Sequence, residues 1–233
     1  MVILQRQKGD VLQWMAFATE KLTNYEQEDF YRDLRAVHLN VIPGVYFSYS
    51  NVGVQLAGFI LERVYDQPFQ VLVDSLVTHP LEMKNTRPTL RPDEIERLAT
   101  GYDDQGRPMP TDRTAAGAAG GLMSTISDLS KYAHWHLDER DPVIELSHTM
   151  PEGDTNGPVM GLSWYIEHSQ EGVRRLSSDG TVPGFSTRIV LYPELDIAAV
   201  VLTNQLDGAI PGLTDRLAHE VLESLNPQAF TYE

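Results

Sequence analysis

The tripeptide Tyr49-Ser50-Asn51 carries side chains that could take part in chemistry together. A phenol has an ordinary pKa of about 10, so it becomes a useful base at neutral pH only where nearby ammonium groups stabilise the phenolate. An Asn side chain both donates and accepts hydrogen bonds, so Asn51 can orient two partners at once. The same residues also fit a turn that leads into a helix. The tripeptide alone leaves both interpretations open.

Nucleophile motifs are missing from the 233 residues. Zero cysteines exclude disulfides, thiolate metal sites and a Cys nucleophile, and they leave the compartment open. The chain has no Gly-x-Ser-x-Gly elbow. No Ser is followed three positions later by Lys, because the residues three positions before Lys8, Lys21, Lys84 and Lys131 are Gln5, Ala18, Leu81 and Asp128.

Two patterns could suggest a metal or a phosphate site. His134-Trp135-His136-Leu137-Asp138 has ligand-like spacing, but on a helix residues two apart point in different directions. We therefore expect solvated histidines there, and surface or satisfied residues at His79, His148, His168 and His219. No Gly-Lys-Ser/Thr follows the Ala115–Gly121 run, which favours helix packing or a pocket wall over a phosphate loop. The sequence predicts no metal and no cofactor.

The first 150 residues have mainly helical patterns. Loose spacing from Asp10 to about Val37 predicts two short helices, and Ile42-Pro43-Gly44 predicts a turn. Apolar positions after Asn51 predict a helix that stops at Asp66-Gln67-Pro68, and a second helix follows from Phe69 to about Val77. Residues 85–120 read as a long irregular connection that could line a site. A further helix starts at the cap candidates of residues 124–128 and ends near Asp138.

The last third has strand patterns. Residues 162–166, 188–192 and 197–202 predict strands of an antiparallel meander, and residues 209–225 predict a closing helix. Helices, then strands, then a helix indicate an α+β fold.

Three blocks of sequence resemble one family. Phe47-Ser48-Tyr49-Ser50-Asn51, preceded by Pro43-Gly44, is similar to a segment of class C β-lactamases and their esterase and D,D-peptidase relatives. Two later blocks agree in the same order, namely Ala119–Thr125 with Asp128-Leu129, and Pro183–Ser186 continuing to Thr203-Asn204. The resemblance implies a β-lactamase/transpeptidase-like fold, with a mainly helical region 1–150 and a region 151–233 of sheet strands and a helix. Together they would form one incomplete domain.

The resemblance also implies roles for residues. In the family a Ser of a Ser-x-x-Lys helix attacks a carbonyl carbon, and the Lys and a Tyr share the proton transfer. Tyr49 matches that Tyr, and Asn51 matches the neighbouring Asn. Ser178-Asp179-Gly180 stands where the family has Lys-Thr-Gly or His-x-Gly, so substrate would bind at Ser178, Gly180 and the Thr181 N–H, an oxyanion donor. A hydroxyl and an acidic neighbour do not attract a substrate carboxylate as Lys does.

The resemblance places the nucleophile helix and the first two strands upstream of this sequence. The chain is then expected to be a truncated part of a serine hydrolase that cleaves an ester, amide or peptide through an acyl-enzyme, and to be inactive alone. A non-catalytic binding module with the same fold is the alternative. The strand near Ile197–Leu202 would be an unpaired edge, which favours self-association.

Composition excludes some partners. The formal charge of −15, from 18 Lys+Arg and 33 Asp+Glu, argues against nucleic acid and against anionic membranes. No apolar run approaches the roughly 20 residues that span a bilayer. Localisation stays undetermined, although full-length relatives of such a chain are often periplasmic or secreted.

Overall fold

The computed structural model describes residues 27–38, 42, 49–109, 117–150, 159–168 and 172–206, and also Gly212, Arg216, Leu217, Glu220 and Ser224. The chain divides into two compact units, Met1–Tyr46 and Phe47–Glu233. The region boundary expected at residue 150 stays a prediction. None of the helices in these described residues is both long and apolar enough to cross a bilayer.

Helix α2 (Gln27–Arg35) is the described element of the first unit. Acidic residues stand in its first turn and Arg35 in its last, which complements the helix dipole. It agrees with the second of the two short helices expected before Val37. The first of them, and the Pro43-Gly44 part of the predicted turn, lie outside the described residues.

In the second unit, two helices follow each other with a short break. Helix α3 (Asn51–Tyr65) begins after the cap residue Ser50 and ends at Asp66, whose backbone is left-handed with φ 53°. Helix α4 (Phe69–Val73) starts directly after Pro68 and continues as a π-helical turn, Asp74–Thr78. Both predicted helices are confirmed, and the change of helix type is the feature that apolar periodicity does not indicate.

The segment 117–120 packs tightly on α3. A Cβ added to Gly58 would lie 2.3 Å from the Ala118 Cβ, and a Cβ added to Gly117 would overlap the Gln55 side chain. Gly58 is buried for this reason. This part of the glycine-rich run therefore serves helix packing, as the missing Gly-Lys-Ser/Thr indicates.

The irregular connection after α4 is anchored at both ends. It contains one 3-10 turn, Pro92–Arg97, and a hairpin of β1 (Gly101–Tyr102) and β2 (Pro108–Met109). Backbone hydrogen bonds of 3.0 and 2.9 Å join Arg87 to Met123, just before α5. At the hairpin, Tyr102 donates to the Asn204 carbonyl (3.0 Å) and accepts from the Leu206 N–H (2.7 Å).

Helices α5 and α6 precede the sheet. Helix α5 (Ile126–Leu137) starts at the cap residue Thr125 and ends at Asp138, as predicted. Helix α6 (Pro142–Ser147) is capped by Asp141 and was not predicted, because six residues are too few for a periodic pattern. Its sequence signal is a cap residue followed directly by Pro.

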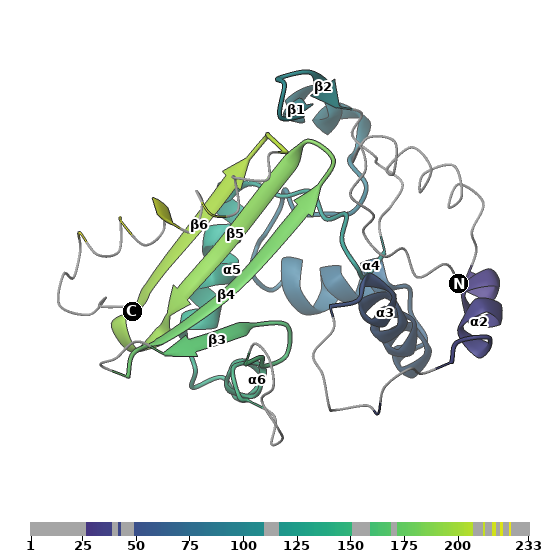
Figure 1. The fold of residues 1–233 in the computed structure, drawn as a ribbon, viewed down its shortest axis with the longest axis horizontal. Coiled ribbons are helices and arrows are strands. Elements are labelled where there is room, and N and C mark those ends of the chain that lie inside the picture. The colour runs from purple at the N-terminus through teal and green to yellow at the C-terminus, as the bar shows by residue number, and fades with distance from the viewer. Residues whose placement is uncertain are drawn as a thin grey trace. The chain divides into compact units, whose positions relative to one another are not determined.

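Four strands form an antiparallel meander in the order β3-β4-β5-β6 (Figure 1). They are β3 (Tyr165–His168), β4 (Arg174–Val182), β5 (Phe185–Tyr192) and β6 (Ile197–Thr203). The meander and the α+β class are confirmed, whereas residues 162–164 of the first predicted strand precede β3. In the closing segment 209–225 the five described residues are helical, and the others lie outside the described part.

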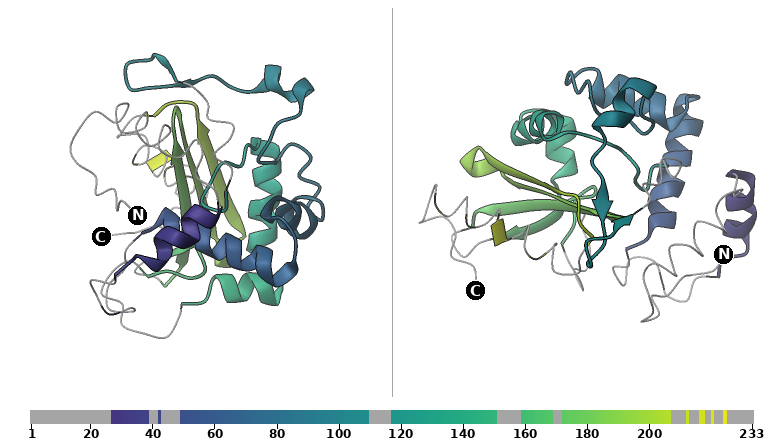
Figure 2. Two further views of the ribbon diagram at one scale, coloured as in Figure 1. Left: turned by 90° about the vertical axis from the view of Figure 1, so that its right-hand side faces the viewer. Right: turned by 90° about the horizontal axis from the view of Figure 1, so that it is seen from above.

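Helix α5 covers one face of this sheet along β5 and β6 (Figures 1 and 2). The core between them contains Ala133, Trp164, Ile166, Leu176 and Leu191. Side chains of a strand alternate between faces, so Val190 and Tyr192 form a second buried cluster on the opposite face. Within the described residues, β6 pairs with β5 alone.

Candidate active site

The start of α3 holds the first pair of candidate residues. Ser50 has extended backbone, and its Oγ accepts a hydrogen bond from the Gly53 N–H (3.1 Å). This cap satisfies one of the free N–H groups in the first helical turn. Tyr49 and Asn51 are therefore fixed on either side of a helix cap.

The two side chains are joined to each other. The Tyr49 hydroxyl donates to Asn51 Oδ1 at 2.9 Å, and the Tyr49 side chain is 66% exposed. The bond orients the phenol and leaves the Asn51 amide hydrogens as donors. In the described residues no Lys or Arg side chain bonds to Tyr49, and the Lys131 ammonium bonds to the Glu82 carbonyl. A cation that would stabilise the phenolate is therefore not supplied by these residues.

The second group of candidates lies on β4. Ser178 is paired with Ile189 and Gly180 with Thr187, which places both on the face of the sheet that α5 covers further along. A Cβ on Gly180 would lie 3.0 Å from Thr187 Oγ1, so glycine keeps this part of the strand open. Thr181 is on the opposite face and exposed.

Asp179, the acidic neighbour expected to weaken anion binding, has a partner of its own. Its carboxylate lies 3.4 Å from Arg188 Nη1 on β5, directly across the strand pair. Because Asp179 alternates with Ser178, its charge is on the opposite face of the sheet. The Asp179 carboxylate therefore does not lie beside the Ser178 hydroxyl. The partner Arg188 could have been found only with the β4–β5 register known.

The structure does not join the two groups of candidates. Among the described residues, no hydrogen bond or ion pair connects Tyr49 or Asn51 with residues 178–181. A pocket of about 320 Å³ adjoins β4 on the Asp179 face, lined by Val159, Tyr165, Ile166, Glu167, Ser177, Asp179 and Arg188. Ser178 and Gly180 do not line it.

The histidines differ from expectation in one respect. His134 is exposed and His136 is buried, so they point in different directions on α5, as predicted. A solvated position for His136 was wrong, because the ring packs against Trp164 and His148. Among the described residues no three His, Asp or Glu side chains are placed to hold a metal ion.

Comparison with known proteins decides the family. The model of the Beta-lactamase family matches residues 10–223. The chain belongs to the β-lactamase family. The match covers the start of α3, all of β4 and β6, and both groups of candidate residues.

Relatives of this β-lactamase family member are longer than the chain. Protein flp of Staphylococcus aureus (strain MRSA252) is 23% identical over 209 residues, which cover 85% of this chain and 41% of flp. The D-alanyl-D-alanine-carboxypeptidase/endopeptidase AmpH of Escherichia coli (strain K12) is 25% identical over 199 residues, 77% of this chain and 50% of AmpH. The chain spans half or less of these curated relatives.

A solved structure has the same fold. The octameric penicillin-binding protein homologue from Pyrococcus abyssi superposes with a TM-score of 0.69 and 27% identity, over 88% of this chain and 47% of that one. The β-lactamase/transpeptidase-like fold is thus confirmed, and the chain is related to serine hydrolases of the β-lactamase and D-alanine carboxypeptidase type.

Proposed function

We propose that the chain forms the Tyr-Asn and β4 part of a serine hydrolase site that cleaves an ester or amide through an acyl-enzyme. The observation that carries the proposal is the Tyr49–Asn51 hydrogen bond of 2.9 Å at a capped helix start, in a chain that the β-lactamase family model matches. The nucleophilic Ser and its Lys would come from residues outside these 233, because no Ser-x-x-Lys occurs among them.

In this proposal each residue has a distinct task. Beside an ammonium group Tyr49 loses its proton to solvent, and the phenolate oxygen then accepts the proton of the nucleophile. Asn51 holds the phenol through Oδ1 before that step and can hold the phenolate by donating from Nδ2. Ser178 and the Thr181 N–H bind the substrate from β4, and the missing side chain at Gly180 lets the acyl group approach the strand.

The 233 residues alone are proposed to be inactive. We expect no turnover of a chromogenic ester or a chromogenic β-lactam, and no mass increase of the protein after incubation with either compound. Turnover, or a covalent adduct on any Ser, would overturn the inactive assignment.

The reading frame upstream of Met1 separates the two functional candidates. An in-frame Ser-x-x-Lys segment there supports the hydrolase. In the protein expressed from that longer frame, Tyr49→Phe should lower kcat/KM by about 100-fold or more. Tyr65→Phe, at the far end of α3, is the matched control and should leave kcat/KM unchanged.

A non-catalytic binding module is the second candidate. It is favoured because the 233 residues contain no Ser-x-x-Lys motif and because Ser178 stands where the family has Lys or His. An upstream frame without Ser-x-x-Lys, together with an inert chain, would select it.

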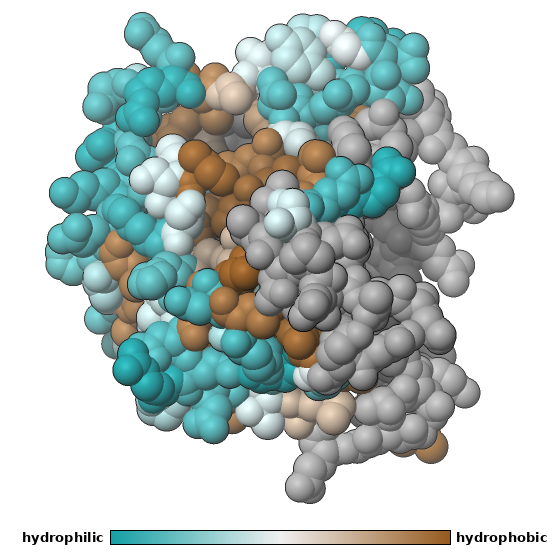
Figure 3. All heavy atoms as spheres, turned by 90° about the vertical axis from the view of Figure 1, so that its left-hand side faces the viewer, coloured by the Kyte–Doolittle hydropathy of each residue, from teal (hydrophilic) through white to brown (hydrophobic). Residues whose placement is uncertain are grey.

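We also propose that β6 pairs with β6 of a second copy. The strand Ile197–Thr203 has no charged residue and no Pro, the usual devices that protect an edge, and within the described residues it pairs on one side only. Figure 3 shows a broad hydrophobic area on the face of the molecule at this end of the sheet.

A further inference from the structure

Two buried histidines face each other between α5 and α6. His136 Nδ1 of α5 lies 3.1 Å from Nε2 of His148, the residue that ends α6. The residues are 4% and 3% exposed. The Trp164 ring lies 5.0 Å from the His136 ring and 5.7 Å from the His148 ring, between centroids. The pair is thus enclosed by aromatic side chains rather than by water.

The pair continues into a chain of charged groups. His148 Nδ1 lies 2.8 Å from Glu139 Oε1, and Glu139 accepts from both terminal nitrogens of Arg174 at 3.0 and 2.5 Å. Arg174 Nε also pairs with Glu194. These contacts connect the end of α5, the end of α6, the start of β4 and the turn after β5.

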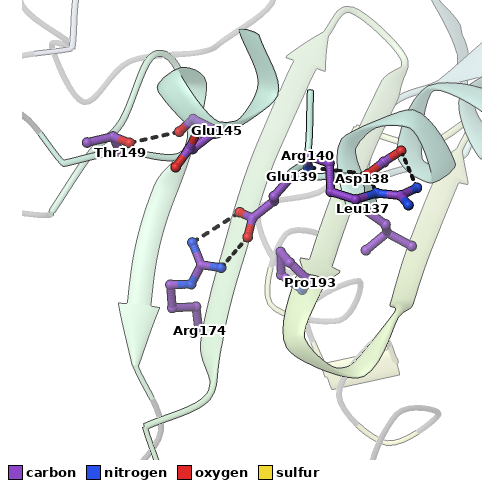
Figure 4. A pocket seen from close by; sticks show the side chains of 8 residues that line it. All are labelled: Leu137, Asp138, Glu139, Arg140, Glu145, Thr149, Arg174 and Pro193. Carbon is purple, nitrogen blue, oxygen red and sulfur yellow. Dashed lines mark hydrogen bonds and ion pairs between the residues drawn. The ribbon is translucent and has the colours of Figure 1, made fainter. Parts of the chain in front are cut away.

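Two of these charged residues, Glu139 and Arg174, form one wall of a surface pocket. Figure 4 shows the side chains of Glu139 and Arg174 pointing toward each other; both line this pocket, which has a volume of about 630 Å³. The other ion pair on its rim is Asp138 with Arg140, at 2.7 Å. Four of the charged side chains on the rim are paired in this way, and the two histidines lie behind Glu139.

The hydrogen bonds fix where the protons are. The Glu139 carboxylate can only accept, so His148 Nδ1 carries a hydrogen. When both rings are neutral, His148 Nε2 carries no hydrogen and accepts a hydrogen bond from His136 Nδ1. The hydrogen bond survives the addition of one proton. His148 is then the cation and donates from its Nε2 to His136 Nδ1, and the single hydrogen of the neutral His136 ring lies on the His136 Nε2. A second proton puts hydrogens on both facing nitrogens, so the bond is lost and two cations repel.

The surroundings decide the pH at which this happens. Burial, the larger cause, and the charge of His148 together lower the pKa of His136 to about 4, and Asp141 acts in the opposite direction. Burial also lowers the pKa of His148, against the hydrogen bond and charge of Glu139, while Arg174 adds to the lowering. Tyr132, which stacks on His136, stays protonated because burial raises its pKa to about 12. Trp135 and Trp164 complete the surroundings and do not titrate.

We propose that the His136–His148 contact is an acid-operated latch, which holds α6 on α5 until both imidazoles carry a proton and then releases α6. Release of α6 also removes His148 from Glu139. Glu139, which forms the pocket wall with Arg174, thereby loses its hydrogen bond to His148.

The ring nitrogens and α6 can be followed together in the 233-residue chain. We expect NMR titration from pH 7.5 to 3.5 to show His136 protonating near pH 4, and hydrogen exchange to show loss of protection in Pro142–Ser147 over the same range. A His136 ring that titrates near its ordinary value of about 6.5, or an α6 that stays protected when both rings are charged, would overturn the latch.

The His136→Asn variant can keep the hydrogen bond to His148 but removes the ring that is protonated. The Asn amide nitrogen takes the place of Nδ1 and can donate to His148 Nε2, but it cannot be protonated. We expect this variant to keep α6 protected below pH 4, whereas His134→Asn, at an exposed position of the same helix, should release α6 at the pH of the unmodified chain. Release of α6 from His136→Asn at that same pH would contradict the proposal.

Discussion

Asp128 connects two segments through one buried carboxylate. The residue is 1% exposed, and its Oδ2 accepts hydrogen bonds from the Asn85 N–H (2.7 Å) and Thr86 Oγ1 (2.9 Å). Asp128→Ala leaves both donors without their acceptor. Because hydrogen bonds to charged groups contribute about 1.5–3 kcal/mol each, we expect loss of the two bonds to lower the free energy of unfolding in urea by about 3–6 kcal/mol. The exposed control Asp93→Ala should stay within about 0.5 kcal/mol, and equal losses in both variants would refute the role of Asp128.

Titration of His136 should make stability depend on pH. Its pKa is about 4 in the folded chain and about 6.5 when unfolded, so the unfolded chain binds more protons between these values. Stability is therefore fully present above about pH 7 and is lost as pH falls from about 6.5 to about 4. The loss is roughly 3 kcal/mol at about 1.4 kcal/mol per pH unit. Urea unfolding at pH 7.5, 5.5 and 4.5 measures it, and the curve for His136→Asn should be flatter.

At the residue scale, the types of the candidate groups could be predicted from the sequence, but their partners could not. Tyr49 and Asn51 are two positions apart, so their proximity follows from the chain itself. Asp179 with Arg188, and His136 with His148, are joined across elements. Those pairs depend on strand register and on how α6 is placed, which single-sequence patterns do not specify.

Glycines of α3 allow a test at the scale of one element. Gly58→Ala would place a Cβ 2.3 Å from that of Ala118, so we expect overpacking to cost about 1–3 kcal/mol of unfolding free energy. At Gly53 the nearest atom would be the Ser50 Cβ at 3.6 Å, an ordinary contact. Gly53→Ala should therefore be neutral or stabilising by up to about 1 kcal/mol, from helix propensity. Thermal unfolding of the two variants compares them, and a stabilised Gly58→Ala would contradict the packing of 117–120 on α3.

Elements with periodic apolar residues and a cap were predictable. Helices α3 and α5 have both signals, and their ends agree with the sequence. Strand β4 reads RRLSSDGTV and lacks apolar alternation, because its Arg175 and Asp179 are paired with charges on neighbouring strands. It was expected only through the resemblance around Ser178. Helix α6 is too short for periodicity, and this element supplies the second histidine of the latch.

For the whole molecule, association through β6 is open to a direct test. Leu202 is 38% exposed, and a Lys in an edge strand opposes pairing with another strand. We expect sedimentation to show concentration-dependent association of the chain, which Leu202→Lys weakens by about 10-fold or more. Leu162→Lys changes the net charge equally at an exposed position outside the strands and should have no effect. A monomer at every concentration would count against the proposal.

The bridge between Tyr102 and residues 204–206 has a consequence for the order of folding. The Asn204 side chain also donates to the Thr100 carbonyl at 2.9 Å, so this contact closes a loop of 104 positions, whereas β3 to β6 lie within Tyr165–Thr203. Closing a longer loop costs more chain entropy, and contacts distant in sequence form more slowly. Pulse-labelling hydrogen exchange should find the β5 amides protected before those of Tyr102 and Leu206. The β1–β2 hairpin would then dock last during folding and detach first during unfolding.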